Sequence, residues 1–558
     1  MNRRNFMELG IAGGILSAIP MGQVAGSVRA TDAKGAKEYA ADIVIAGGGL
    51  GGCAAAFAAL RNGQKVIMTE ETDWIGGQIT QQGVPPDEHP WIETHGATQL
   101  YRSFRTAVRN YYFRNYPLTD EAKARPQLNP GDGSVSRLCH EPRVTLAVLY
   151  EMFAPYLGAG KLMILLEHKV KAADVTGDKV CALKVVDLRR KEEVILSAPY
   201  FIDATELGDL LPLTGTEFRT GAESQKETGE LHAAAQADPQ NQQAFTVCFA
   251  MDYIEGANLT IDKPETYNFW RTYIPDLTPA WSGPLLDLTY SSPSTLEPKK
   301  LGFHPGGISL GSTLNLWNYR RIISKDNFTP GSYASDITIV NWPQNDYLLG
   351  NPDAGFDRHV SRAKQLSLSL FYWLQTECPR ADGKQGWPGL RLRGDVLGTA
   401  DGMAKYPYVR ESRRIQALFT VLEEHVGKAN REMVSGEKTA APFFDSIGVG
   451  YYHIDLHPTT RGNNYLDFDS LPFQIPLGAL IPQRMENLLP ANKNIGTTHI
   501  TNGCYRVHPA EWNIGESAGM LAACSLKNRL PPRAIRESPE RLADFQRAIR
   551  SQGIETQW

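Results

Sequence analysis

The sequence predicts an α/β protein in which a central parallel sheet is interrupted by an inserted α+β domain. Three observations lead to this prediction: an early apolar strand that runs into a glycine-rich turn, a strand–helix–strand order around that turn, and late strand-like segments that return to the same sheet. The chain has 558 residues, enough for two domains with separate cores. Its 42% apolar and 21% charged residues are typical of globular proteins, and no Lys/Arg-rich run predicts a nucleic-acid partner.

The first thirty residues have the pattern of a twin-arginine export signal. Arg3 and Arg4 are adjacent, and an apolar stretch follows from Leu9 to about Val24, with a peptidase site predicted at Ala30. A membrane anchor is disfavoured, because this stretch is rich in glycine and contains a proline, whereas a spanning helix needs about 20 apolar residues. We therefore expect export by the twin-arginine machinery to the periplasm or the medium.

The seven cysteines are scattered along the chain and form no CxxC pair. Neither a zinc site nor a redox dithiol is therefore predicted, and most of the thiols are expected to be buried as small apolar groups. The absence of a disulfide framework fits a chain that folds in a reducing compartment before it is exported.

A strand–turn–helix–strand unit follows the signal. Residues 42–46 (DIVIA) predict a buried parallel strand, which runs directly into the turn GGGLGG at 47–52. An alanine-rich helix is predicted over 53–62, and a second strand over 65–69 ends at Glu70. Because these parts occur in order within about 30 residues, they predict a Rossmann-like dinucleotide-binding unit.

Each glycine of the GxGxxG pattern has a separate task. Gly47 permits the tight turn, Gly49 lets the backbone approach a pyrophosphate, and Gly52 lets the helix pack closely on the strand. The start of the helix offers free N–H groups to the phosphates. Glu70 is placed to accept hydrogen bonds from the ribose hydroxyls.

Two further segments indicate FAD rather than NAD. Residues 70–78 read EETDWIGGQ, and the second glycine pair, Gly76 and Gly77, precedes Gln78. NAD enzymes have no standard use for such a loop, whereas many flavoproteins use one to cross beneath the flavin. The strand-like run 200–206 ends in Asp203, Ala204 and Thr205, and it resembles the strand that re-enters the FAD domain of those proteins.

The C-terminal region contains the most informative segment after the glycine turn. A strand-like run over 493–499 leads into residues 505–519, YRVHPAEWNIGESAG. Pro509 favours a helix start, with His508 near the N-cap, and small residues let the helix approach a ligand or strand closely. The segment resembles the C-terminal helix that, in flavoproteins of this kind, points its N-terminus at the flavin. The resemblance implies that the positive end of this helix would stabilise the charge gained on reduction. Asn513 and Gly515 are accordingly predicted to contact the cofactor.

Together these segments resemble the FAD-dependent oxidoreductase family within the glutathione-reductase-like flavoproteins, and the resemblance covers most of the mature chain. It implies non-covalent FAD but fixes no substrate. Besides the segments already quoted, it includes CHEPR at 139–143, DATELGDL at 203–210, RESRR at 410–414 and DLHP at 455–458.

The predicted organisation has one discontinuous nucleotide-binding domain. The middle of the chain, rich in tryptophan and tyrosine, would form a substrate or cap domain whose aromatic residues are mostly core. The predicted parts are a signal over 1–30, a linker over 31–39, the FAD-binding domain over 40–215 and 470–535, the cap over 216–469 and a C-terminal tail over 536–558.

Histidine is the expected base for a reaction in which hydride leaves a carbon beside a hydroxyl or amine. His508 is the first candidate, because the predicted helix start places it at the flavin, and His499 is the second. His457 and His140 follow. For each of them a purely structural role is the alternative.

Arginines are the candidates for binding a substrate carboxylate. We predict that role for Arg506, with Arg410 as a further candidate. Arg413 and Arg414 are expected instead to form internal ion pairs or to anchor the cap.

An exported flavoenzyme has little access to soluble NAD(P)H. The leading hypothesis is therefore a periplasmic dehydrogenase or oxidase that takes hydride from a sugar, polyol or hydroxy acid and passes electrons to a quinone, a cytochrome or oxygen. One alternative is a fumarate-reductase-like enzyme fed by a separate cytochrome, since the chain has no CxxCH haem site. Another is a flavin-binding protein without turnover.

Overall fold

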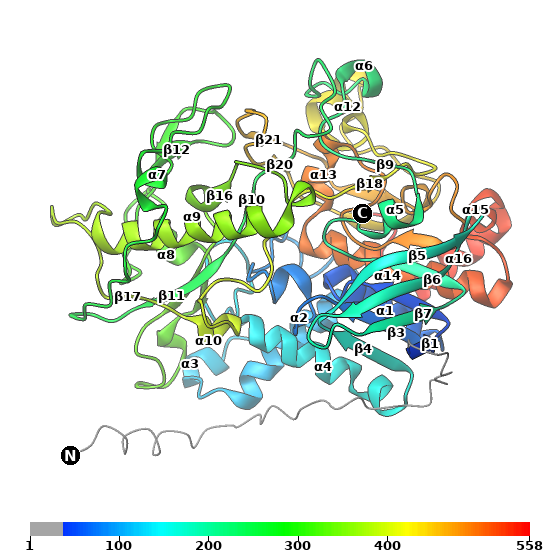
Figure 1. The fold of residues 1–558 in the computed structure, drawn as a ribbon, viewed down its shortest axis with the longest axis horizontal. Coiled ribbons are helices and arrows are strands. Elements are labelled where there is room, and N and C mark those ends of the chain that lie inside the picture. The colour runs from blue at the N-terminus through cyan, green and yellow to red at the C-terminus, as the bar shows by residue number, and fades with distance from the viewer. Residues whose placement is uncertain (1–36) are drawn as a thin grey trace.

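The computed structural model describes residues 37–558. The predicted signal over 1–30 and most of the predicted linker lie outside the described residues. Figure 1 shows two parts: one contains the parallel sheet and the C-terminal helices, and the other is crossed by the long helix α9 (Phe356–Thr376).

The first part is built on a five-stranded parallel sheet in the order β23-β8-β2-β3-β4. This arrangement confirms the predicted α/β fold. The predicted late strand at 493–499 is wrong: the chain is extended at 488–490 instead, and the later residues form a loop that leads into a helix. The strands are β2 (Ile43–Ala46), β3 (Val66–Glu70), β4 (Leu162–Leu166), β8 (Tyr200–Asp203) and β23 (Leu488–Pro490).

A second sheet, in the order β1-β7-β6-β5, covers one face of the parallel sheet. Apolar side chains from both sheets, among them Val44, Ile67, Leu183 and Leu196, share one core. The last residues of the predicted linker belong to this sheet, because β1 pairs in parallel with β7. Its strands are β1 (Lys37–Ala40), β5 (His168–Thr176), β6 (Lys179–Asp187) and β7 (Glu193–Ser197).

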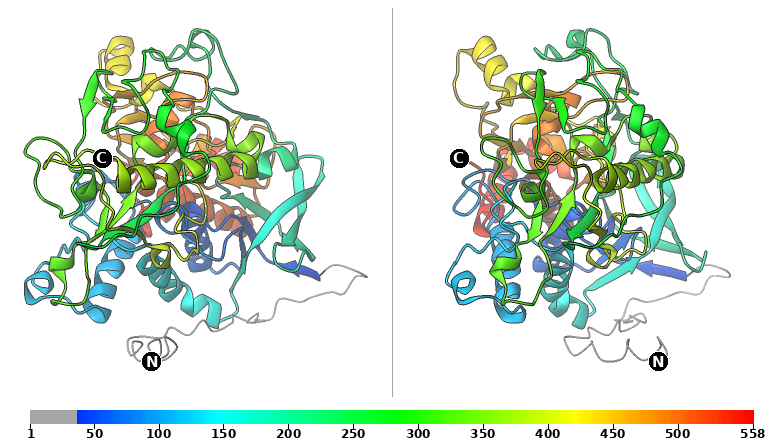
Figure 2. Two further views of the ribbon diagram at one scale, coloured as in Figure 1. Left: turned by 60° about the vertical axis from the view of Figure 1, so that its left-hand side comes forward. Right: turned by 90° about the vertical axis from the view of Figure 1, so that its left-hand side faces the viewer.

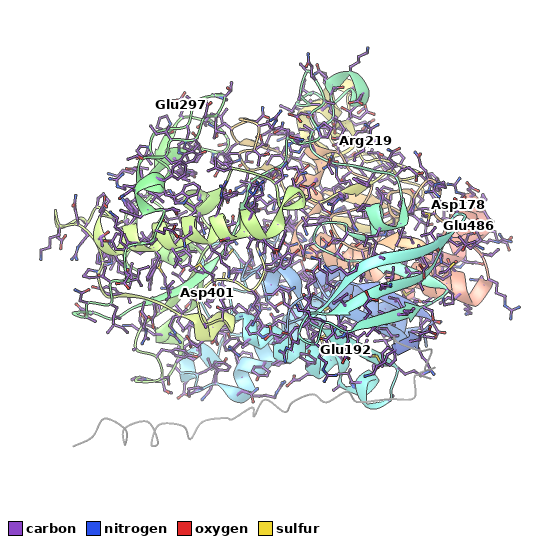
Figure 3. The ribbon with its side chains drawn as sticks, viewed as in Figure 1. Asp178, Glu192, Arg219, Glu297, Asp401 and Glu486 are labelled. Atoms are coloured by element: carbon purple, nitrogen blue, oxygen red, sulfur yellow. The ribbon has the colours of Figure 1, made fainter. Side chains whose placement is uncertain are left out.

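The β5–β6 turn is fastened to the segment that precedes β23. Asp178 and Glu486 lie close together at that end of the sheet in Figure 3, and the Glu486 N–H donates to the Asp178 carbonyl over 2.9 Å. Arg484 also pairs with the Asp178 carboxylate at 2.7 Å. The two sheets are therefore joined at their edges as well as through their shared core.

Helices cover the other face of the parallel sheet. α1 (Leu50–Arg61) and α14 (His508–Asn528) pack against each other, because glycines on α14 remove the side chains that would separate them. A Cβ at Gly515 would overlap the carbonyl of Gly51, and one at Gly519 would overlap that of Ala55. The other large helices of this layer are α2 (Gln99–Asn115) and α4 (Pro142–Gly158).

The C-terminal residues predicted as a tail are part of this domain. α15 (Pro532–Glu537) and α16 (Pro539–Ser551) lie beside α14, and Phe545 and Ile549 are buried in the main core. The apolar spacing on α16 explains this placement, because one face of an amphipathic helix must be covered.

The second part of the molecule has its own aromatic core, as predicted. Its sheet has the order β14-β15-β11-β17, and tryptophans such as Trp317, Trp342 and Trp373 are buried between this sheet and α9. Figure 2 shows these green elements in front of the nucleotide-binding elements. The strands are β11 (Phe249–Tyr253), β14 (Arg321–Ile323), β15 (Ile337–Val340) and β17 (Leu390–Leu392).

Much of the chain from 414 to 480 packs on the nucleotide-binding domain rather than on the cap. Val421, Ile447 and Phe473 share the core that contains α1 and α14. The elements here are β18 (Arg414–Ile415), α11 (Glu423–Val426), α12 (Lys428–Ser435), β19 (Ser446–Gly450), β20 (Ile454–Leu456), β21 (Leu466–Phe468) and β22 (Phe473–Pro476).

Short elements complete the described chain. They are α3 (Asp120–Lys123), α5 (Leu210–Thr214), β9 (Phe218–Arg219), α6 (Gln225–Thr228), β10 (Phe245–Thr246), α7 (Tyr267–Thr272), β12 (Thr289–Ser291), β13 (Pro298–Lys300), α8 (Leu316–Tyr319), β16 (Asp346–Tyr347), α10 (Gly394–Leu397) and α13 (His499–Tyr505). Within residues 37–558, no helix combines the length and the apolar character needed to cross a bilayer.

Candidate functional site

The glycine turn between β2 and α1 is shaped so that only glycine fits its key positions. Gly47 has φ +97°, and a Cβ there would overlap the carbonyl of Ala204. A Cβ at Gly52 would overlap the carbonyl of Gly47. Gly49 is the N-cap of α1, so the N–H groups of the first helical turn, which have no carbonyl partner within the helix, lie at this loop.

Glu70 lies at the end of β3, beside this loop. Its Oε2 accepts the Gly48 N–H at 3.0 Å, and its Oε1 accepts the N–H of Thr72 at 2.8 Å and the Gln81 amide at 3.0 Å. Burial raises the pKa of Glu70 to about 7. The carboxylate is thus held at the loop where the sequence predicts contact with a ribose.

The second glycine pair is packed directly on the first turn. The Gly76 N–H donates to the Gly48 carbonyl at 2.8 Å, and Gly77, with φ +57°, lies so close that a Cβ would be 2.9 Å from the Gly49 Cα. Gln78 donates to the Arg506 carbonyl at 3.0 Å, while its Oε1 is buried without a partner among the described residues. This loop therefore connects the phosphate-binding turn to the segment before α14.

The end of β8 forms the opposite wall. Asp203 is fully buried; it accepts the Thr205 hydroxyl at 2.7 Å and the Leu210 N–H at 3.0 Å, and burial raises its pKa to about 7. Its role is to hold the turn, so that Ala204 faces Gly47 and Thr205 faces the loop. A hollow of about 380 Å³ lies here, lined by Gly47, Gly49, Glu70, Thr205, Glu206 and Tyr406.

An ion pair that the sequence did not single out lies beside the hollow. Lys493 Nζ is 2.5 Å from Glu206 Oε2, and both side chains are buried. The other oxygen of Glu206 has no partner within residues 37–558, and it lies 3.1 Å from the position of a Cβ on Gly49. Both residues directly follow strands that end at this edge of the sheet, which is the signal that would have identified them.

These residues fit FAD. The turn provides a cradle that any Cβ would fill, α1 offers N–H groups to a pyrophosphate, and Glu70 can accept ribose hydroxyls. Buried polar atoms of Gln78, Gln82 and Glu206 lack partners among the described residues, as expected where a polar ligand would supply them.

The structure places His508, the first candidate base, in an enclosed position. It is fully buried at the first residue of α14, where its Nδ1 accepts the Asp87 N–H at 3.1 Å and its Nε2 lies 3.3 Å from the Val84 carbonyl. Burial lowers the pKa of His508 to about 4. With both ring nitrogens engaged, the neutral imidazole joins α14 to the loop that contains Val84 and Asp87, and it has no free atom for a substrate.

Asn513 and Gly515 are likewise engaged in packing. Asn513 donates to the Ile447 carbonyl at 3.2 Å, on the neighbouring strand β19, and Gly515 makes the close contact with α1 described above. A nearby side chain reaches the phosphate-binding helix instead: Glu511 accepts the Gly51 N–H at 3.0 Å. Burial raises the pKa of Glu511 to about 7.

A partly open cavity of about 860 Å³ adjoins Arg506, and we call it the arginine chamber. Its walls contain buried N–H groups that have no partner within residues 37–558, on Arg320, Arg410, Arg506 and Trp342. Its polar and aromatic lining includes Asp87, Tyr319, Arg320, Trp342, Tyr408, Arg410, Tyr452, His453, Asp455, His457, Tyr465 and Arg506.

The side chains of the chamber wall form a closed ring of contacts. Arg506 donates to the Tyr408 hydroxyl at 2.8 Å, and the Arg410 guanidinium lies 4.8 Å from the centre of the Tyr408 ring. Arg410 pairs with Asp346 at 3.0 Å, and Asp346 is 2.6 Å from His457 Nδ1. His457 Nε2 is 3.7 Å from Asp455, which pairs with Arg506 at 3.0 Å and so closes the ring. Although burial alone would raise the pKa of both aspartates, the cations around them hold it low, at about 2 for Asp455.

His457 is the best-placed histidine for proton transfer. Its Nδ1 is held by Asp346, which leaves Nε2 at the chamber, 3.7 Å from Asp455, and its side chain is 18% exposed. By contrast, His140 is buried, with its Nδ1 3.0 Å from the Leu138 carbonyl and its Nε2 bonded to Thr145. Sequence reasoning ranked His457 low because Asp346 is far away along the chain.

A second cavity, of about 800 Å³, is next to the arginine chamber, and His457 and Tyr465 line both spaces. We call it the glutamate chamber, because Glu223 and Glu230 line it. His499, the second candidate base, faces this chamber, with Nδ1 3.0 Å from Glu411. The structure therefore separates the candidates: Arg506 and His457 line the arginine chamber, His499 lines the glutamate chamber, and His508 lines neither.

Arg413 and Arg414 form the internal ion pairs expected from the sequence. Arg414 pairs with Glu411 at 2.6 Å and with Glu223 at 2.9 Å, and Arg413 pairs with Asp209 at 3.2 Å.

A family model described as FAD dependent oxidoreductase matches residues 42–549. The chain belongs to this family. FAD is thus its cofactor, and the redox activity predicted from the glycine turn is confirmed at the level of the family. The comparison with curated protein sequences finds no match.

The chain has low similarity to several solved structures. L-proline dehydrogenase from P. horikoshii is 16% identical, with a TM-score of 0.17, and the match covers 34% of this chain and 26% of that one. The OxyS anhydrotetracycline hydroxylase from Streptomyces rimosus is 12% identical, with a TM-score of 0.33 and coverages of 92% and 66%. The quinol fumarate reductase subunit FrdA of E. coli is 12% identical, with a TM-score of 0.33 and coverages of 92% and 74%. The chain thus spans less than two thirds of the first two relatives, and similarities at this level carry no information on its substrate.

Proposed function

We propose that this FAD-dependent oxidoreductase oxidises a hydroxylated small molecule in the arginine chamber, with His457 as the base. The observation that carries the proposal is the Asp346–His457 pair in the chamber wall. An imidazole whose Nδ1 is fixed by a carboxylate presents Nε2 in a defined direction, as general base catalysis requires.

The proposed reaction breaks one C–H and one O–H bond of the substrate. Bound FAD supplies the acceptor for the hydride from the carbon that carries the hydroxyl. His457 Nε2 takes the hydroxyl proton, and the negative charge of Asp346 stabilises the resulting imidazolium. The unpartnered N–H groups of the arginines and of Trp342 suit the oxygen atoms of such a substrate.

The balance of charge in the arginine chamber favours an uncharged sugar or polyol over an acid. A reductase of the fumarate type would need a surplus of positive charge to hold a dicarboxylate. Here each arginine is already paired with an aspartate: Arg320 with Asp87 at 3.3 Å, Arg410 with Asp346 at 3.0 Å and Arg506 with Asp455 at 3.0 Å. The aromatic side chains around the pairs provide flat apolar surfaces for the C–H faces of a sugar or polyol.

We further propose that the protein acts after twin-arginine export, in the periplasm or outside the cell. The adjacent arginines and the apolar stretch at the N-terminus support this location. There the electrons would pass to a quinone, a cytochrome or oxygen, because soluble NAD(P)H is scarce outside the cytoplasm. Fractionation of cells expressing the full chain tests the location: a protein retained in the cytoplasm would exclude it.

The experiment that tests the reaction is anaerobic mixing of the purified holoprotein with sorbitol, glucose and gluconate while the flavin absorbance is followed. Bleaching by sorbitol or glucose is the expected result. Reoxidation of the chemically reduced protein by fumarate, without bleaching by any hydroxylated compound, would favour the reductase instead. No response to either treatment would favour a flavin-binding protein without turnover.

A further inference from the structure

The glutamate chamber lies directly beyond the proposed base. His457 and Tyr465 line both chambers, so the two spaces meet at these side chains and a hydroxyl group held at His457 lies beside the glutamate chamber. Both spaces are partly open, and each has its own set of polar side chains in its wall. The chemistry of the second chamber therefore bears on which polyol is accepted.

Almost every carboxylate around the glutamate chamber already pairs with an arginine or a histidine. Within residues 37–558, Glu223 pairs with Arg414 at 2.9 Å, Glu411 with His499 at 3.0 Å and Glu423 with His232 at 2.7 Å. The charges of these carboxylates are balanced within the wall, so they are not available to bind a cationic ligand.

Glu230 is the exception. Its side chain is buried in the chamber wall, at 1% exposure, and no cation of the described chain pairs with it. Oε1 accepts the Thr498 hydroxyl at 2.6 Å and the Glu423 N–H at 2.9 Å, whereas Oε2 has no partner in residues 37–558. An unsatisfied buried carboxylate oxygen costs stability unless a ligand donates to it.

The unpartnered atoms of the two chambers are of opposite kinds. In the arginine chamber they are N–H donors, on three arginines and Trp342. In the glutamate chamber they are oxygen acceptors, on Glu230 and on Asn241, which is also buried. A substrate that satisfies both must present oxygen atoms at one end and hydrogen-bond donors at the other.

We propose that the glutamate chamber is a subsite for a protonated amine, held by Glu230, so that the substrate is a polyol or sugar carrying an amino group. The proposal rests on the proposed function, since it takes the reacting hydroxyl to lie at His457. A cationic amine provides the strongest donor for a lone carboxylate, because a charge-assisted hydrogen bond in a buried site exceeds a neutral one. Asn241 offers a second acceptor in the same wall.

The test compares two ligands that differ only in this group: glucamine, which is sorbitol with one terminal hydroxyl replaced by an amine, and sorbitol itself. Dissociation constants are measured by calorimetry on holoprotein whose flavin has been chemically reduced, so that no oxidation accompanies binding. At pH 8, above the pKa of about 7 that burial gives Glu230, we expect glucamine to bind at least about 10-fold more tightly.

Glu230→Gln keeps an acceptor for Thr498 and for the Glu423 N–H but removes the charge. We expect it to reduce the preference for glucamine to within about 2-fold, because the charge-assisted hydrogen bond to the amine is lost. Glu424→Gln, on a neighbouring side chain that is 40% exposed and outside the chamber, is the matched control and should keep the wild-type preference. A melting curve establishes that each variant is folded.

Equal affinities in the wild type, a preference that persists in Glu230→Gln, or no binding of either ligand would each overturn the subsite. The two proposals fail separately, because binding is read without turnover. Flavin bleaching by sorbitol without any amine preference would leave the reaction standing and remove the subsite. A preference for glucamine that depends on Glu230, in a protein whose flavin no hydroxylated compound bleaches, would support the subsite and remove the proposed reaction.

Discussion

The phosphate-binding turn and the two chambers are built in different ways. The turn consists of residues close together in sequence, and its key contacts involve backbone atoms, such as those of Gly47 and Gly49. The chambers combine side chains from distant segments; the Asp346–His457 pair, for example, joins the short strand β16 to the chain after β20. The first site therefore tolerates almost no change in backbone shape, whereas the second depends on charge pairs that can be exchanged one at a time.

This difference has a practical consequence for which substitutions inform about function. Changes in the turn remove the cofactor and the fold together, since a clash with backbone atoms cannot be relieved by a rotamer change. Changes in the chambers can alter one chemical step while the flavin stays bound. The following predictions, from the largest expected effect to the smallest, test this contrast.

Gly47→Ala should abolish FAD binding and the yield of folded protein. Its φ of +97° and the overlap with the Ala204 carbonyl leave no room for a Cβ. The measurement is the flavin absorbance of the purified protein and its soluble yield. Gly158→Ala is the control, because no atom lies within 4 Å of its added Cβ. A yellow, stable Gly47→Ala protein would show that the turn is less constrained than the structure indicates.

His457→Asn should slow flavin reduction by the proposed substrate by about 10²- to 10⁴-fold, since a positioned general base contributes on that scale. FAD content should not change, because His457 makes no contact with the phosphate-binding turn in the structure. The rate of anaerobic bleaching measures the effect.

His508→Gln provides the comparison with the candidate favoured by sequence. Since its ring only joins α14 to the Val84 and Asp87 loop, the variant should melt at a lower temperature but reduce its flavin at close to the wild-type rate. The reverse pattern, a normal His457→Asn rate and a slow His508→Gln rate, would restore His508 as the base.

Lys493→Met should destabilise the protein by about 3–5 kcal/mol, because it leaves the buried carboxylate of Glu206 without its cation. Urea denaturation measures this, and adding Glu206→Gln to the variant should recover most of the loss. Lys428→Met, at an ion pair with side chains 59% and 73% exposed, should change stability by less than about 1 kcal/mol. Similar losses at both sites would contradict the role of burial.

Glu516→Gln should raise the free energy of unfolding relative to the wild type, and this gain should be larger at pH 8 than at pH 4.5. Burial raises the pKa of Glu516 from 4.5 to about 7, so the folded state holds its proton more tightly than the unfolded state does. The wild type therefore loses up to roughly 3 kcal/mol from this group as the pH rises through that window, and glutamine does not. Unfolding at the two pH values measures the difference, with Glu540→Gln on exposed α16 as the control for loss of one charge. A pH-independent difference would contradict the shift.

The glycine turn shows how much a sequence can predict when the determinants are local. Strands β2 and β3, helix α1 and the position of Glu70 all follow from residues within one continuous stretch. The predicted strand at 493–499 was wrong because it was inferred from a short segment alone. In the structure the edge of the sheet is formed by Leu488–Pro490 instead.

The candidate histidines show where local patterns stop being sufficient. The sequence ranked His508 first, because of the predicted helix start, and placed His457 behind His499. The structure engages both nitrogens of His508 and leaves Nε2 of His457 at a chamber. A histidine acquires its role from the groups around the ring, and Asp346, Asp455 and Tyr465 are brought there only by folding.

The amino-acid sequence by itself determined the fold class, the cofactor family and the turn that binds the phosphates, because backbone geometry at glycine and the alternation of strands and helices are local properties. Tertiary structure alone decided which histidine faces a cavity, that the arginines are neutralised by aspartates, and that Glu230 is left without a cation. These are properties of charge and burial, which depend on neighbours that are close in space and distant along the chain.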